Sequence, residues 1–144
     1  MKRIRGLGAK LPLRRDEEDG YALIKTHHEA IRQNMKNLIL TNPGERIMIP
    51  NFGAGLSRFL FEPNSAAVYD NISGTIRAQI KLFMPFVTIH EIRIANSTDT
   101  WSDHSGELTP LDQRATQRGE NEISVGIHYE VPALRVSTML QINL

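Results

Sequence analysis

The sequence predicts an α+β domain in which two main helices pack on one face of a small, mostly antiparallel sheet. Two stretches in the first part of the chain repeat apolar residues every three or four positions, as the buried face of a helix does. Two stretches near the end alternate apolar and polar residues, as half-buried strands do. Helices followed by a run of strands give the α+β order, and a C-terminal β-hairpin completes it.

The first helix is predicted to begin after Thr26 and to end at residues 41–44. Thr26 and Glu29 have the spacing of a capping box, in which each side chain satisfies a free amide of the first turn. The sequence Thr-Asn-Pro-Gly at 41–44 then stops the helix. Residues 21–24, just before the helix, are expected to be extended. The buried stripe of this helix consists of Ile31, Met35, Leu38 and Ile39.

The second helix is predicted to follow a cap at Asn64 or Ser65 and to end at Pro85. After it, residues 86–95 show the alternation of a strand, with a change of phase between Ile89 and Ile92. A phase change of this kind predicts a β-bulge near His90 and Glu91. The buried face of the helix consists of Tyr69, Ile72, Ile76, Ile80 and Phe83.

The end of the chain carries the clearest strand pattern. Residues 123–131 alternate strictly, and residues 134–144 alternate again after Pro132 and Ala133. Two such runs joined by a short connection predict an antiparallel hairpin. The last strand is either an edge strand, ready to accept a strand from another chain, or an internal and fully paired one. The pattern alone leaves both open.

Composition indicates one globular domain. The chain has 144 residues, of which 40% are hydrophobic and 23% charged. No apolar run is long enough to span a membrane, and the N-terminus lacks the apolar block of a signal peptide. The absence of cysteine excludes disulfides, thiol nucleophiles and zinc–cysteine sites. We expect a flexible arm at residues 1–20, then one domain at 21–144 with a polar excursion at 96–121.

The arm is basic and then acidic. Residues 1–15 contain only basic charged side chains, and an acidic run at 16–19 follows directly. Such an arm either binds an acidic partner or a phosphate backbone, or is a solvated tail. Because the remainder of the chain is net acidic, the sequence disfavours nucleic-acid binding. In the excursion, Trp101 is either a packing residue or a partner contact.

Residues 40–63, LTNPGERIMIPNFGAGLSRFLFEP, are dense in turn-forming residues but match no catalytic or nucleotide-binding motif. The Gly-x-Gly at 53–55 is followed by Arg58 where a dinucleotide site needs glycine, and no Walker motif occurs. These glycines therefore predict turns with positive φ or close backbone approach. A hydrolytic site would need two carboxylates, and the candidates for such a pair are Glu45, Glu62 and Glu91.

Metal and nucleophile chemistry has no support in the sequence. His27 and His28 are adjacent, which points them apart on a helix, and His90, His104 and His128 are isolated. No Gly-x-Ser-x-Gly elbow is present. We therefore predict no catalytic residue, no cofactor and no metal site, and a protein that is not an enzyme.

The spaced motif Pro-Gly-Glu-Arg at 43–46, Pro-Asn-Phe-Gly at 50–53, Leu56 and Phe-Leu-Phe-Glu-Pro at 59–63 resembles the gene-product-25-like (W/25) family of baseplate wedge proteins. This family belongs to contractile phage tails and has relatives in type VI secretion baseplates. The order of helix, motif, helix and strands resembles the family over residues 20–144, apart from the excursion at 96–121.

The resemblance implies a structural role at the inner baseplate, beside the central hub, as a sheath initiator. It implies contact with the sheath protein, wedge proteins and hub or tube proteins, in several copies, with no membrane partner. The location implied is the virion tail baseplate, made and assembled in the host cytoplasm. Whether the particle is a phage, a phage-like particle or a secretion system stays open. The alternative function is a peptidoglycan hydrolase, since the family has often carried a lysozyme label.

The resemblance also assigns candidate contact residues. Family members usually carry Glu-Pro-Arg after the second helix, which holds the wedge core helices, whereas this chain has Met84, Pro85 and Phe86. We expect an apolar contact in place of the charged one, and either a partner contact or a local ion pair for Glu45 and Arg46. The predicted wedge and hub contacts are Glu45, Arg46, Pro50, Phe52, Gly53, Met84, Pro85 and Phe86. The predicted sheath-pairing residues are Val136, Thr138, Leu140, Ile142 and Leu144, and deletion of 136–144 is expected to leave a folded protein.

Overall fold

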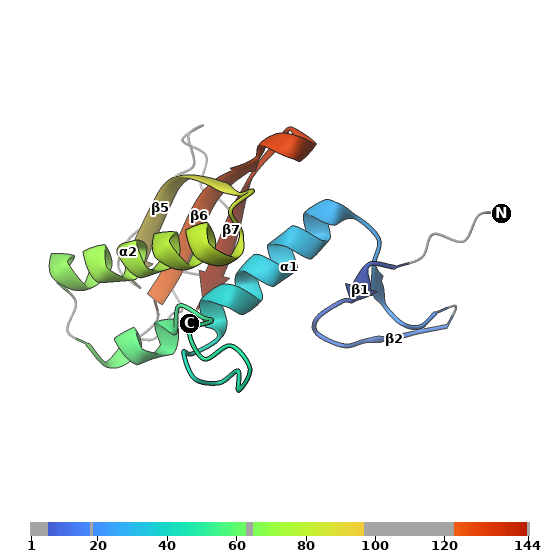
Figure 1. Cartoon of the computed structure of the whole chain (residues 1–144), viewed down its shortest axis with the longest axis horizontal. Coiled ribbons are helices and arrows are strands. Elements are labelled where there is room, and N and C mark those ends of the chain that lie inside the picture. The colour runs from blue at the N-terminus through green and yellow to red at the C-terminus, as the bar shows by residue number, and fades with distance from the viewer. Residues whose placement is uncertain (1–5, 18, 63–64, 97–122, 144) are drawn as a thin grey trace.

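A computed structural model of the chain describes residues 6–17, 19–62, 65–96 and 123–143 (Figure 1). Four two-residue strands come first, and the two main helices and the three strands of the sheet follow. The elements are β1 (Gly8–Ala9), β2 (Arg15–Asp16), β3 (Gly20–Tyr21), β4 (Leu23–Ile24), α1 (His27–Leu40), a 3-10 helix (Leu56–Phe61), α2 (Ala66–Phe83), β5 (Thr88–Asn96), β6 (Ile123–Val131), a 3-10 turn (Pro132–Leu134) and β7 (Val136–Asn143).

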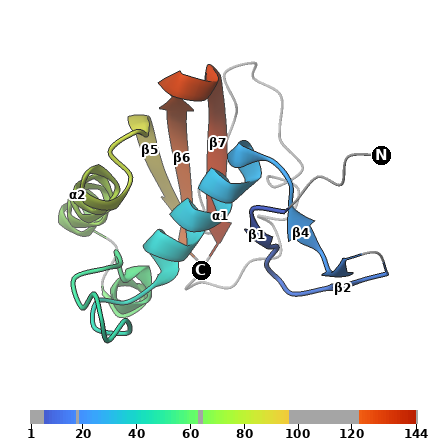
Figure 2. The ribbon, with the colours of Figure 1, turned by 45° about the vertical axis from the view of Figure 1, so that its right-hand side comes forward.

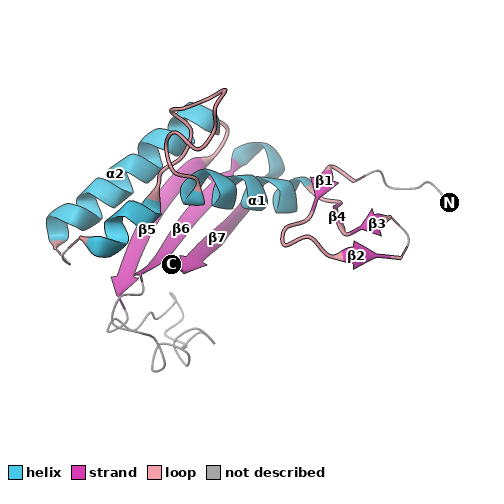
Figure 3. Cartoon of the chain, turned by 90° about the horizontal axis from the view of Figure 1, so that it is seen from below, coloured by secondary structure: helices cyan, strands magenta, loops and turns pink. Residues whose placement is uncertain are grey.

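The main sheet is antiparallel with the strand order β5-β6-β7, and both helices cover the same face of it (Figures 1 and 3). The predicted α+β class is confirmed. The predicted bulge is also confirmed, because the register between β5 and β6 shifts between Ile89 and Glu91. The shift is needed because Ile89 and Ile92 both pack against the core, although an uninterrupted strand would point them to opposite faces.

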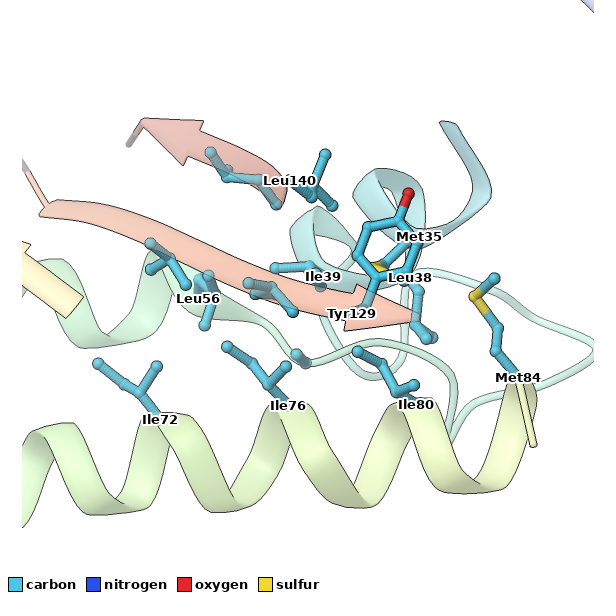
Figure 4. Close-up of a cluster of buried hydrophobic side chains, with 14 of the residues drawn as sticks. Met35, Leu38, Ile39, Leu56, Ile72, Ile76, Ile80, Met84, Tyr129 and Leu140 are labelled. Atoms are coloured by element: carbon cyan, nitrogen blue, oxygen red, sulfur yellow. The ribbon is translucent and has the colours of Figure 1, made fainter. Parts of the chain in front are cut away.

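One core lies between the helices and the sheet (Figure 4). Tyr129 of β6 is fully buried and belongs to this core. The predicted apolar stripes of both helices supply most of the helical side of the core. Among the largest fully buried side chains are Met35, Leu38, Ile39, Leu56, Ile72, Ile76, Ile80, Ile127, Leu140 and Ile142.

Side-chain caps begin both helices. The hydroxyl of Thr26 accepts from the amide of Glu29 at 3.2 Å, as the capping box predicts. The carboxylate of Glu29 contacts the Thr26 hydroxyl at 3.3 Å and Lys10 at 3.3 Å. Ser65, one of the two predicted caps, begins α2 by accepting from the amide of Val68 at 3.4 Å.

The hairpin between β6 and β7 is confirmed, but the predicted start of its second strand is wrong. Leu134 belongs to a 3-10 turn that opens with Pro132, and β7 begins at Val136. The turn closes because Pro132 has a fixed φ suited to its first position and Arg135 adopts a left-handed φ of 51°. The alternating pattern extended into a turn because a 3-10 segment this short has no periodicity of its own.

The described residues of the N-terminal segment fold back on themselves. β1 pairs with β4 and β2 pairs with β3, both antiparallel. Gln33 of α1 holds this arm, because its amide donates to the carbonyl of Ala9 at 3.0 Å and accepts from the amide of Leu11 at 2.9 Å. The pairing links residues 8–16 to residues 20–24, across the boundary predicted at residue 20, and flexibility of the arm stays a prediction.

Some predicted features lie outside the described residues. These are residues 1–5, residues 97–122 with Trp101 and His104, and Leu144. Among the residues that the structure describes, no helix is long and apolar enough to cross a membrane.

Candidate assembly interface

The connection between α1 and α2 is built around Asn42. The side chain of Glu45 accepts from the backbone amide of Asn42 at 3.0 Å and from its side-chain amide at 2.8 Å. The carboxamide oxygen of Asn42 in turn accepts from the hydroxyl of Ser57 at 2.7 Å. Glu45 therefore stabilises the turn locally, and no ion pair between Glu45 and Arg46 occurs in the described part of the chain.

Gly53 brings the returning loop against the end of α1. It has a φ of 115°, and a Cβ at this position would overlap the backbone oxygen of Thr41. Gln79 of α2 then fastens the same segment, because it accepts from the amide of Gly53 at 3.1 Å and donates to the carbonyl of Asn51 at 3.1 Å. The sequence-based prediction of positive φ and close approach is confirmed here.

Arg46 and Phe52 form the side of this loop that faces α2. The guanidinium of Arg46 lies 3.7 Å from the centre of the Phe52 ring. Phe52 also meets Phe83 edge to face, with ring centres 4.9 Å apart. The stack therefore connects the loop with the last residue of α2 and fixes the direction of the cationic head.

A groove of about 350 Å³ lies where α1, the loop and the end of α2 meet. Four of the predicted contact residues line it: Arg46 and Phe52 from the loop, and Met84 and Phe86 from beyond α2. Residues far apart in sequence are thus brought to one place. Its other lining residues are Asn34, Asn37, Leu38, Ile49 and Phe83, which sequence reasoning did not assign to a site.

The other predicted contact residues do not line this groove. Gly53 is buried, and the side chain of Glu45 is used within its own turn. The carbonyl of Pro50 accepts from the amide of Gly44 at 2.8 Å, which closes the loop. Pro85 is exposed beside the groove residues Met84 and Phe86.

The loop tip presents apolar side chains to solvent. Ile47 is 93% exposed and Met48 is 91% exposed, although hydrogen bonds fix the loop backbone on both sides of them. Phe86, at the rim of the groove, is 49% exposed. Large exposed apolar side chains on an ordered turn indicate an interaction surface, because burial in the protein's own core does not account for them.

Within the part of the chain that the structure describes, the last strand lies at the edge of the sheet, which is the first of the two arrangements that its pattern left open. Among the described residues β7 has β6 as its single neighbour. Leu140 and Ile142 are each 2% exposed and belong to the protein's own core. The part of β7 that remains available for pairing is therefore its backbone edge, and its inward side chains are not.

Acid–base and metal chemistry receive no support from the described residues. Glu91 is held by Arg93 through two hydrogen bonds of 2.7 and 2.9 Å, and Glu62 is exposed at the end of the 3-10 helix. On the outer sheet face His90 contacts Glu130 at 3.0 Å and His128 contacts Ser137 at 3.1 Å. No group of three or more potential metal ligands occurs in the part of the chain that the structure describes.

A family model for the baseplate wedge protein gp25 matches residues 25–133, which is most of the chain. The chain belongs to the gp25 family of baseplate wedge proteins. The match includes α1, the loop, α2, β5 and β6, and it ends before β7. As a member of this family the chain is a structural protein of a tail baseplate, where it associates with other baseplate components.

Two solved structures have the same fold. A candidate tail lysozyme from Geobacter sulfurreducens has a TM-score of 0.62 and 16% identity, and the match covers 85% of this chain and 94% of that one. A chain of the anti-feeding prophage baseplate has a TM-score of 0.55 and 22% identity, with coverage of 92% and 82%. A search of curated protein sequences gives no significant match.

Proposed function

We propose that the protein joins the inner baseplate to the sheath of a contractile tail and initiates sheath assembly through β7. The observation that carries the proposal is the position of β7, which has one neighbour in the described part of the sheet and buries its inward side chains in the domain core. One row of backbone amides and carbonyls is therefore left to pair with a strand of the sheath protein. Backbone pairing gives such a contact affinity without requiring particular side chains.

The groove lined by Arg46, Phe52, Met84 and Phe86 is the proposed contact with wedge and hub or tube proteins. Its mixed apolar and cationic lining suits an apolar side chain flanked by a carboxylate on the partner. Met84 and Phe86 would supply apolar contact where family members usually place charges. The protein would act in several copies, in baseplates assembled in the host cytoplasm, and without enzymatic activity.

The strand contact is tested with proline. Deletion of residues 136–144 is a poor test, because it removes Leu140 and Ile142 from the core. Along an edge strand, consecutive amides face the neighbouring strand and the open edge in turn. Of Thr138→Pro and Met139→Pro, we expect one to lose a bond to β6 and the other to lose a solvent-facing amide alone.

The proline variant that keeps the wild-type melting temperature then replaces the wild-type protein during assembly of the particle. We expect electron microscopy to show baseplates that carry tubes without sheath. Normal sheath growth from this folded variant would refute the role of β7. The other proline variant, which is destabilised, serves as the folding control.

A further inference from the structure

A second groove runs beside the open edge of β7. It has a volume of about 270 Å³ and lies between the arm, α1 and β7. Figure 2 shows α1 lying across β7, with the arm beyond it. The lining residues are Lys10 and Leu11 of the arm, Ile24 of β4, Glu29, Arg32, Gln33 and Lys36 of α1, and Leu140 and Gln141 of β7.

The described side chains that line the groove carry a net positive charge. Lys10 is paired with Glu29 at 3.3 Å, and that pair holds the pKa of Glu29 below its ordinary value. Arg32 and Lys36 have no carboxylate within ion-pair distance among the described residues. Two cations four positions apart on a helix repel one another, so they do not stabilise α1.

The walls of the groove are held in place before any partner binds. Gln33 bonds the arm on either side of Lys10, at the carbonyl of Ala9 and the amide of Leu11. Leu140 is anchored in the core, which fixes the β7 wall. A site prepared in this way loses little conformational entropy when a ligand binds.

We propose that this groove selects an acidic segment: the strand that adds to β7 carries carboxylates on the side that faces α1, where they meet Arg32 and Lys36. The inference rests on the proposed role of β7. One wall is the edge of β7, which has no neighbouring strand on that side among the described residues, and a strand edge favours a polypeptide over a nucleic acid. In a strand, side chains on one face repeat every ~6.6 Å, close to the ~6 Å rise between two helix residues four positions apart. Carboxylates at alternate positions therefore fit the two cations.

The test compares two charge reversals in the full chain, with the purified sheath protein of the same particle as the probe. The first variant is Arg32→Glu with Lys36→Glu. The control is Arg77→Glu with Lys81→Glu, an exposed cation pair of the same spacing on α2, which packs beside β5 at the other edge of the sheet. Circular dichroism melts exclude loss of folding, and Arg32→Gln with Lys36→Gln replaces the first variant if reversal unfolds it.

We expect the groove variant to raise the Kd for the sheath protein roughly tenfold at low salt, and the control to change it less than about twofold. The difference should shrink at high salt, because exposed charges are screened. Lysine substitutions of the acidic residues in the sheath segment should restore binding to the groove variant.

The other outcomes overturn the inference at different levels. Equal effects of both charge reversals, with wild-type binding intact, would refute the acidic groove but keep β7 as the docking strand. Absence of sheath binding by the wild type would refute both. Loss of single-stranded DNA binding in the groove variant, with sheath binding unchanged, would assign the cations to nucleic acid instead.

Discussion

The guanidinium of Arg46 lies over the face of the Phe52 ring, 3.7 Å from its centre. This contact, and not a pairing with Glu45, determines where the charge of Arg46 points. Because Phe52 also packs edge-on against Phe83, the cationic head is fixed at the rim of the groove. A cation stacked on an aromatic ring keeps its outer donors available to a carboxylate of a partner.

Arg46→Ala is expected to weaken binding of wedge proteins while changing stability little. The lost stacking should cost about 0.5–1 kcal/mol of folding free energy, as at other exposed sites. The matched control is Arg58→Ala, since Arg58 stacks over Phe59 at 4.6 Å and does not line the groove. Urea unfolding measures the first effect and pull-down of wedge proteins the second. Equal loss of wedge-protein binding in both variants would show that Arg46 has no special role in this contact.

Gly53→Ala is expected to destabilise the protein by several kcal/mol. An alanine there would combine a strained positive φ with overlap against the backbone of Thr41. Gly74→Ala provides the opposite case, because Gly74 lies within α2 and a Cβ added there would meet nothing within 4 Å. There we expect stabilisation of about 0.5–1 kcal/mol. Thermal melts measure the stability of both variants. Similar shifts in melting temperature would contradict the close approach of Gly53 to the backbone of Thr41.

The helices, the strands and the bulge could be predicted because apolar periodicity is a local property. The paired arm could not, since strands of two residues are too short to show alternation. The bonds between Asn42 and Glu45 were missed, although an Asn-Pro-Gly turn with an acid three residues later is a local signal. The groove required tertiary information, because Asn34 and Asn37 of α1 and Phe86 from beyond α2 come to line it only when the elements pack.

Tyr129→Phe is expected to leave stability unchanged or slightly increased. The hydroxyl of Tyr129 is buried and has no hydrogen-bond partner among the described residues, and leaving a buried polar group unpaired costs about 1–3 kcal/mol. Burial raises the pKa of Tyr129 above its ordinary value of 10.0, and nearby Arg32 opposes the rise. Because the pKa is higher in the folded state than in the unfolded state, stability has its full value below pH 10.0 and is lost as the pH rises further.

The variant Tyr129→Phe should therefore lose less stability than the wild type between neutral pH and alkaline pH. Tyr21→Phe is the control, because Tyr21 is 56% exposed and outside the core. Denaturant unfolding at a series of pH values gives the comparison. An alkaline loss of stability that is unchanged by Tyr129→Phe would show that Tyr129 does not cause it.

Serine substitutions at Ile47 and Met48 are expected to leave folding intact and to impair baseplate assembly. Both side chains are more than nine-tenths exposed, so their removal takes no apolar area out of the core. The loop keeps its shape through backbone bonds, such as that from Gly44 to Pro50 at 2.8 Å. Leu82→Ser on α2, at a side chain 65% exposed, controls for a general loss of surface hydrophobicity. The measurement is the fraction of the protein that enters baseplates on a sucrose gradient. If the tip binds a baseplate partner, that fraction falls for the two loop variants and not for Leu82→Ser; equal incorporation of all three would show that the tip is not a contact.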